Sequence, residues 1–510
     1  MSETSSSSSA PAWQRGRATG WLLSTDHKRM GALWFALAGV AAAAAAVPAV
    51  LTYFHEAWPD LELLGGPMFG ALTTYGGTLL AYGVLVPLAV GLAVALVPLQ
   101  IGARGIAFAP LVSGAFWLGA FGVLAVIVSP FATGPAPQSG WVTAPEVALD
   151  PAITAESVRL VGLLLLSLSL VVTAVALLAT LHSQRAPGMT WERMPFFAQA
   201  ANAYAAALIP LAGVSALGST LLLLGRENPG SFDWYVTEEG IVGGYEWVFQ
   251  QGVVLISLVV ALGAVIEIAG TFARRPLPGR RAVTHGLVAV AVLAAVVPSV
   301  GALGGHTWAQ TLMLVVAAVA VAAGAPAAFA ALSPTTLRGL KPGSPTGFAA
   351  GSLKLWLVAA LVALLDLLGV AEAGAARAEA FLCAGLVGLL GALVYWWPKL
   401  FGRVIDGRPL VVVLASATAG SLALVGGKTF DVKVLAAVGT FALVAALLVF
   451  AATALQALVL GRRVGGDPWL GDTLEWYASS PAPAGNFSSL PPVESARPLA
   501  DLRARLGERD

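Results

Sequence analysis

The feature that most constrains the fold of this chain is a series of about twelve long apolar stretches separated by short polar connections. A helix needs ~20 apolar residues to cross the hydrocarbon core of a bilayer. The stretches lie near residues 32–54, 69–99, 106–133, 156–182, 196–224, 240–270, 282–304, 308–334, 349–370, 373–395, 409–427 and 431–461. Of the 510 residues, 58% are hydrophobic and only 11% are charged, whereas soluble domains have ~25% charged residues. We therefore predict an all-α polytopic membrane protein with about twelve transmembrane helices, and a water-soluble enzyme is excluded.

The basic residues predict the orientation of these helices. Alternate connections hold most of the Lys and Arg, for example Arg274–Arg275 and Arg462–Arg463, while the opposite side has few, such as Arg226. By the positive-inside rule, both termini are cytoplasmic and the protein is a multi-pass protein of a bacterial-type inner (plasma) membrane.

The chain divides into one membrane domain and two polar ends. Residues 1–25 contain no apolar signal-peptide core and are predicted to form a disordered cytoplasmic tail. Residues 26–465 form the twelve-helix domain, and the proline-rich residues 466–510 are predicted to form an extended tail along the cytoplasmic face.

A net charge of +1 gives no reason to expect a nucleic-acid partner. The single cysteine, Cys383, is predicted to be a buried structural thiol.

Five strings, taken in order, point to one family. They are STDHKRMGALWF, VPLQIGARGIAFAPL, TFARRPLPG, YWWPKLFGR and the tail string that begins DPWLGDTLEWYASSPAPAGNF. Each resembles the matching segment of cytochrome c oxidase subunit I, of the haem–copper oxidase superfamily, and together they cover nearly the whole chain. The resemblance implies a twelve-helix bundle with three pseudo-symmetric arcs of helices.

The resemblance also implies six histidine ligands, two for a low-spin haem, one for a high-spin haem and three for copper. In this sequence the corresponding positions hold Gly76, Gln251, Val300, Gly301, Ala376 and Ala378, and the position of the family's cross-linked tyrosine holds Leu255. None of these side chains is an imidazole, the ligand that suits both metals. We therefore predict a degenerate paralogue with no catalytic, cofactor-binding or metal-binding residues at these positions, and with no haem or copper.

The family's proton-uptake residues are also replaced. The position of a glutamate on the sixth helix holds Val253, and those of an aspartate and an asparagine near the third helix hold Gly105 and Val112. The lysine of the second path falls near Pro326. Small or apolar residues thus stand where the family takes up protons.

The five histidines of the sequence offer no replacement metal site. His27, His182 and His285 are expected at the cytoplasmic face, and His55 and His306 at the outer face. These faces are ~30 Å apart, so histidine alone cannot supply three ligands to one ion, and only His55 and His306 could meet.

Charges inside predicted spans are expensive and therefore suggest function. The candidates are Asp366, Glu267 and Glu246. We expect Glu267 to reach towards Arg274 and Arg275. Two interpretations of Asp366 are open. It faces a polar pocket or a partner subunit within the membrane, or it lies near the outer end of its helix.

Alanine-rich runs such as Ala41–Ala46 would let helices approach closely. These runs indicate either that the family's haem cavities have closed or simply that alanine is common in this chain. If a cavity is left, it could hold lipid or a quinone.

We predict a haem-free structural or accessory subunit of a respiratory oxidase complex or supercomplex, partnered by other respiratory-chain membrane subunits, such as a true oxidase subunit or a cytochrome complex. One alternative is an active terminal oxidase that oxidises cytochrome c, reduces oxygen and pumps protons with unrecognised ligands. The other is a repurposed lipid-binding, quinone-binding or transport protein.

Overall fold

The fold is known from a computed structural model that describes residues 20–21, 24–132, 154–228, 252–302, 306–331, 343–370, 374–405 and 407–507. Within these ranges the secondary structure is helical, and β-pairing is limited to one isolated bridge between Arg403 and Arg463. The all-α expectation is confirmed.

Each apolar stretch of the sequence corresponds to a helix. The helices are α2 (His27–Ala57), α3 (Gly66–Thr78), the π-helical segment η3 (Leu79–Leu85), α4 (Val86–Gln100), α5 (Ala109–Val128), α7 (Thr154–Ser183), α8 (Phe196–Glu227), α11 (Val253–Ala273), α12 (Arg280–Ala302), α13 (His306–Ala331), α15 (Pro345–Leu367), α16 (Gly374–Phe401), α17 (Arg408–Thr429) and α18 (Lys433–Leu460). The segments α3, η3 and α4 form one continuous span, Gly66–Gln100. In the described part of the chain, eleven spans are long and apolar enough to cross a membrane. With α12, a further helix of 23 residues, they make up a multi-pass membrane bundle.

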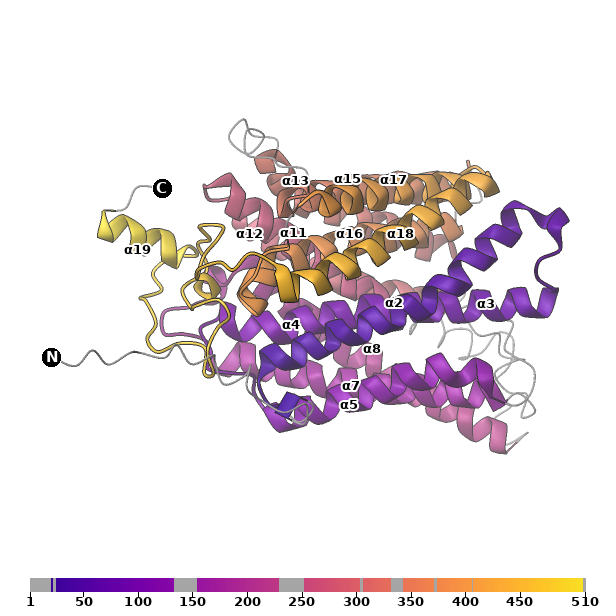
Figure 1. Ribbon diagram of the computed structural model, residues 1–510, viewed down its shortest axis with the longest axis horizontal. Coiled ribbons are helices and arrows are strands. Elements are labelled where there is room, and N and C mark those ends of the chain that lie inside the picture. The colour runs from indigo at the N-terminus through magenta and orange to yellow at the C-terminus, as the bar shows by residue number, and fades with distance from the viewer. Residues whose placement is uncertain are drawn as a thin grey trace.

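The helices run side by side along the long axis of the molecule (Figure 1). The span Gly66–Gln100 and α11 are central, because 94% of the most apolar window of each is buried, against 28% for α2 and 39% for α18. Helix α11 packs on α4, α8, α13 and α16, and α2 packs on α4 and α18. The core is therefore built around two nearly all-apolar helices, and the outer helices turn one face to the surroundings.

The C-terminal tail lies across one end of the bundle, opposite the turn that joins α2 to α3 (Figure 1). It contains the 3-10 turn η7 (Leu474–Trp476) and the helix α19 (Pro498–Leu506). The tail is thus not wholly extended as expected, because Pro at the first position of α19 and acidic Asp501 in its first turn favour a helix start there. Most of the predicted N-terminal tail, residues 1–19 and 22–23, lies outside the described residues.

Candidate functional site: an apolar cavity and a polar rim

Two of the predicted ligand positions lie on the wall of one cavity. Gly76 on α3 and Ala378 on α16 both line a space of about 420 Å³ that is also bounded by α2, η3, α17 and α18. The two positions are 302 residues apart in the sequence, yet the fold brings them to one wall.

Small side chains leave this space open. The α2 wall includes Ala42, Ala45, Ala46 and Ala49, and α3 contributes Gly76 and Gly77. The backbone then changes from α-helical to π-helical at Leu79–Leu85, a local change that often accompanies functional sites. Here the alanine run of α2 borders an open cavity.

One part of the cavity wall is polar. Tyr53 Oη donates a hydrogen bond of 2.7 Å to Glu379 Oε1. The other carboxylate oxygen, Glu379 Oε2, is buried and has no hydrogen-bond partner among the described residues. Lys428 Nζ lies 3.5 Å from Glu56 Oε2 and 4.7 Å from the centre of the Tyr53 ring. Two carboxyl groups, a phenol and one ammonium group therefore meet on a wall that is mostly apolar.

Cys383 also lines the cavity, one helical turn after Glu379 on α16. It is buried and free, as expected of a structural thiol.

The other predicted positions lie elsewhere. Leu255 on α11 and Ala376 on α16 are 6% and 1% exposed and belong to the hydrophobic core. Gln251 is outside the described residues, and Val300 and Gly301 lie in α12 but their side chains are not described. Of the replaced proton-path positions, Val253 and Val112 are core residues, while Gly105 lies in the loop between α4 and α5 and Pro326 is inside α13.

The cavity side chains do not fit a haem held by two imidazoles, because no histidine lines this wall. In the described part of the chain, no group of three or more His, Cys, Asp or Glu side chains is placed to hold a metal ion. His27 Nδ1 instead donates to Ala95 O at 3.0 Å, and His182 stacks on Trp191 with ring centres 5.7 Å apart. His55 is at the far end of α2, His285 is in the first two turns of α12 and His306 begins α13.

Asp366 has a partner that the sequence reading did not identify. It forms a buried ion pair with Arg377, which lies in the first turn of α16. Asp366 is near the C-terminal end of α15. This supports the interpretation that it lies near a helix end, and does not support a polar pocket in the middle of the membrane. The basic partner lies on the next helix, across the α15–α16 turn, where a search along α15 alone cannot find it.

The expectation for Glu267 needs a correction. Its Oε2 accepts a 2.7 Å hydrogen bond from the backbone N of Phe196, the first residue of α8. A carboxylate is favoured at a helix N-terminus, where backbone N–H groups lack partners, and this attraction replaces the expected approach to Arg274 and Arg275. Glu246, the third charge, lies outside the described residues.

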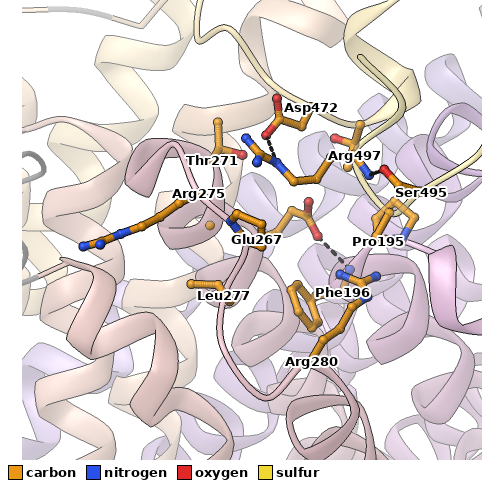
Figure 2. Close-up of a pocket in the computed structure, with 14 residues that line it drawn as sticks. Pro195, Phe196, Glu267, Thr271, Arg275, Leu277, Arg280, Asp472, Ser495 and Arg497 are labelled. Atoms are coloured by element: carbon orange, nitrogen blue, oxygen red, sulfur yellow. Dashed lines mark hydrogen bonds and ion pairs between the residues drawn. The ribbon is translucent and has the colours of Figure 1, made fainter. Parts of the chain in front are cut away.

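Glu267 borders a smaller pocket of about 240 Å³ between the ends of α8, α11 and α12 and the C-terminal tail (Figure 2). Arg280, which stacks over the Phe196 ring, and the tail residue Arg497 point towards it. Arg497 Nε donates to Asp472 Oδ2 at 2.6 Å. This contact joins two segments of the tail where the tail covers the bundle.

The strings that carry the family resemblance meet at this end of the bundle, which we call the polar rim. From the first string, His27 lies 3.1 Å from Asn486 Oδ1 in the tail. From the second, Ala103 O accepts a 2.8 Å hydrogen bond from Asn486 Nδ2. From the third, Arg274 donates to Leu470 O at 2.8 Å. Segments hundreds of residues apart thus form one contact network with the tail.

The fourth string, YWWPK, holds the tail most extensively. Lys399 Nζ is buried and donates to the backbone oxygens of Gly466 and Ala478, at 3.0 and 2.7 Å. Tyr395 Oη accepts from Trp476 Nε1 at 3.0 Å. Because the lysine replaces lost hydration with carbonyl oxygens, this end of α16 and the tail stabilise each other.

Glu475 of η7 is the most deeply buried acid of the rim. Its Oε1 accepts from Gln100 Nε2 at 3.1 Å and from Trp396 Nε1 at 3.2 Å. Burial raises the pKa of this carboxyl above its ordinary value, and these hydrogen bonds only partly oppose the increase. Docking of the tail therefore shifts the protonation equilibrium of Glu475 towards its protonated form.

Residues 29–366 match the family model described as cytochrome C and quinol oxidase polypeptide I. The chain belongs to this family. It is 27% identical to cytochrome c oxidase subunit 1 of Bacillus subtilis over 94% of this chain and 82% of the relative. It is 28% identical to a putative cytochrome c oxidase subunit 1-beta of Streptomyces coelicolor over 98% and 94%. A haem-copper oxidase subunit I+III of Aeropyrum pernix is 27% identical over 93% of this chain and 62% of the relative. The resemblance inferred from the five strings is confirmed, and the chain is a haem–copper oxidase subunit I-like membrane protein.

Proposed function

We propose that this chain is a haem-free, non-catalytic member of its family that serves as a structural or accessory subunit of a respiratory oxidase complex or supercomplex. The observation that carries the proposal is the cavity wall at Gly76 and Ala378, which holds no imidazole. A bis-histidine haem needs one nitrogen ligand on each side of the iron, and glycine and alanine supply none.

The polar rim supports a role as a subunit. A chain without redox chemistry keeps Lys399 buried under the tail and Glu475 buried against Trp396, arrangements that are costly unless every contact is made. We infer that the rim presents the tail in a fixed shape to neighbouring membrane subunits. The partners are other respiratory-chain subunits, such as a true oxidase subunit or a cytochrome complex, in a bacterial plasma membrane with both termini cytoplasmic.

An active terminal oxidase is the second candidate, because the relatives are named as oxidase subunits. It requires iron and copper ligands other than the positions identified above. The alternative of a transport protein loses its main support. That support was Asp366, a charged residue within a predicted span, and Asp366 is neutralised by Arg377.

Co-purification tests the proposed role. The full chain, tagged at its N-terminus, is expressed at its native level, extracted in a mild detergent, and its complexes are analysed by native electrophoresis and mass spectrometry. We expect oxidase or cytochrome subunits in fixed ratio to the tagged chain. A tagged polytopic transporter from the same membrane controls for chance co-extraction. Recovery of this chain alone, under conditions that keep the host oxidase intact, would contradict the proposal.

A matched variant sharpens the test. Lys399→Met removes the ammonium group that holds the tail but keeps a side chain of similar length. If the docked tail forms the partner surface, this variant stays in the membrane and loses its co-purifying subunits. The control Lys354→Met changes a lysine on α15 that is exposed and is expected to retain them.

A further inference from the structure

We propose that the cavity between α2, α3, α16 and α18 binds an apolar molecule that carries a hydroxyl group, and that this hydroxyl donates a hydrogen bond to Glu379. The proposal deepens the proposed function and rests on it in one respect, the absence of haem from this cavity.

The size and lining of the cavity suit an apolar body. Its volume of about 420 Å³ is within the range of small-molecule sites. Most of its wall is alanine, leucine and valine from α2, α3, η3, α16, α17 and α18, including Leu382 and Leu386 of α16 and Leu443 and Leu447 of α18. Apolar walls hold water poorly, so a hydrocarbon ligand gains the dispersion contacts that an unfilled space forgoes.

Glu379 defines the chemistry of the ligand's polar end. Tyr53 satisfies one carboxylate oxygen, and the other is buried without a partner in the described chain. A buried acceptor left unpaired costs free energy, so a donor on the ligand is favoured. The one ammonium group there, Lys428, already pairs with Glu56, and no second Lys or Arg is among the residues that line the cavity. A phosphate or carboxylate head group would therefore lack a free cation, and a neutral hydroxyl is favoured.

Two sources supply this chemistry. One is a neutral lipid with an alcohol group, such as a diacylglycerol or a long-chain alcohol. The other is the phenol of a membrane hydroquinone, which becomes a quinone without a hydroxyl donor when it is oxidised. Both would place a hydroxyl at Glu379 and a hydrocarbon chain along α2 and α18.

Cys383 gives a direct measure of occupancy, because it lines the cavity and is the only cysteine in the sequence. In the test, the detergent-purified full chain reacts with N-ethylmaleimide, and intact-mass spectrometry follows the labelling rate. The reaction is repeated with 1-dodecanol, with dodecyl methyl ether, and with decyl-hydroquinone and its oxidised quinone. Cys383→Ser controls for labelling at other groups.

We expect 1-dodecanol to slow the labelling of Cys383 at about tenfold lower concentration than dodecyl methyl ether, since a hydrogen bond to a buried oxygen that otherwise has no partner has about this effect on affinity. Protection by the hydroquinone but not by the quinone identifies a hydroquinone site, and protection by the alcohol alone identifies a neutral-lipid site. Equal protection by the alcohol and the ether overturns the proposal, as does the absence of protection by any compound.

Variants test the role of Glu379. Glu379→Met keeps the length of the side chain and removes the acceptor, so the advantage of the alcohol over the ether should disappear. The matched control, Glu62→Met, changes an exposed glutamate in the α2–α3 connection and should preserve it. An undiminished advantage in Glu379→Met also contradicts the proposal, and the wild-type comparison of alcohol with ether needs no variant to fold. A haem found in the purified chain would refute the proposed function, whereas a haem-free chain without hydroxyl preference would refute only this inference.

Discussion

The two halves of α16 differ in how closely their neighbours approach. In the N-terminal half, Ala378, Glu379 and Cys383 face an open cavity. In the C-terminal half, a Cβ added to Gly391 would lie 2.7 Å from Phe348 Cβ, and one added to Gly388 would lie 3.0 Å from Ser352 Oγ. One helix thus borders a space at one end and packs without spare room at the other.

This difference shows where the scaffold is restrained. The C-terminal half continues into Trp396 and Lys399, which hold the tail, so any shift there disturbs the polar rim. The N-terminal half borders the cavity and carries Ala378 at one of the predicted ligand positions. Substitutions should therefore be costly in the packed half and well tolerated around the cavity.

The largest effect is expected for Gly391→Ala. The new methyl group would overlap Phe348, which is fully buried, and overpacking costs about 1–3 kcal/mol. The matched control is Gly213→Ala in α8, where an added Cβ has no atom within 4 Å. Thermal aggregation in detergent, followed by size-exclusion chromatography, should show a lower midpoint for Gly391→Ala and an unchanged or higher one for Gly213→Ala. Equal midpoints would mean that the packed half is looser than described.

A smaller, pH-dependent effect is expected at the polar rim. Burial raises the pKa of Glu475 in the docked tail, so the docked state binds more protons than the undocked one. Tail docking is then strongest below the ordinary glutamate pKa of about 4.3 and weakens as the pH rises through the raised value. Limited proteolysis of the tail should accelerate with pH after correction for protease activity. Glu475→Gln, which keeps an oxygen acceptor, should flatten this dependence, and an equally steep profile in the variant would assign it to another group.

The smallest effect is expected for Ala46→Leu, which adds three carbon atoms towards the cavity. Because space is available, we expect the stability to change by less than about 1 kcal/mol. The same thermal assay applies, with Ala38→Leu as the control, because Ala38 is a core residue of the same helix. A destabilisation of Ala46→Leu as large as that of Ala38→Leu would show that the cavity is closed in solution.

The sequence predicted the bundle well, because apolar stretches of membrane-spanning length specify helices without knowledge of their neighbours. Two of the positions that it singled out, Gly76 and Ala378, line the same cavity. The pairings of charged groups were missed. Asp366 meets Arg377 across a helix–helix turn, and Glu267 meets the start of α8. Such partners are set by how helices pack in three dimensions. The sequence of a single helix does not contain this information.

The polar part of the cavity was missed for the same reason. Tyr53 and Glu379 are 326 residues apart and their hydrogen bond joins α2 to α16. Glu379 lies one residue after Ala378 and three residues after Ala376, both predicted ligand positions, and this proximity was the available signal. A carboxylate beside the lost ligands could have been recognised as a candidate contact for whatever fills the cavity.

Haem and copper content tests the central claim most directly. The full chain is purified without added cofactors from a host that assembles its own haem–copper oxidase, and that oxidase is purified in parallel as the positive control. A reduced-minus-oxidised spectrum and elemental analysis then give haem, iron and copper per chain. We predict no haem band and far less than one iron or copper per chain. A stoichiometric haem band in the isolated chain would contradict the account and favour an active oxidase.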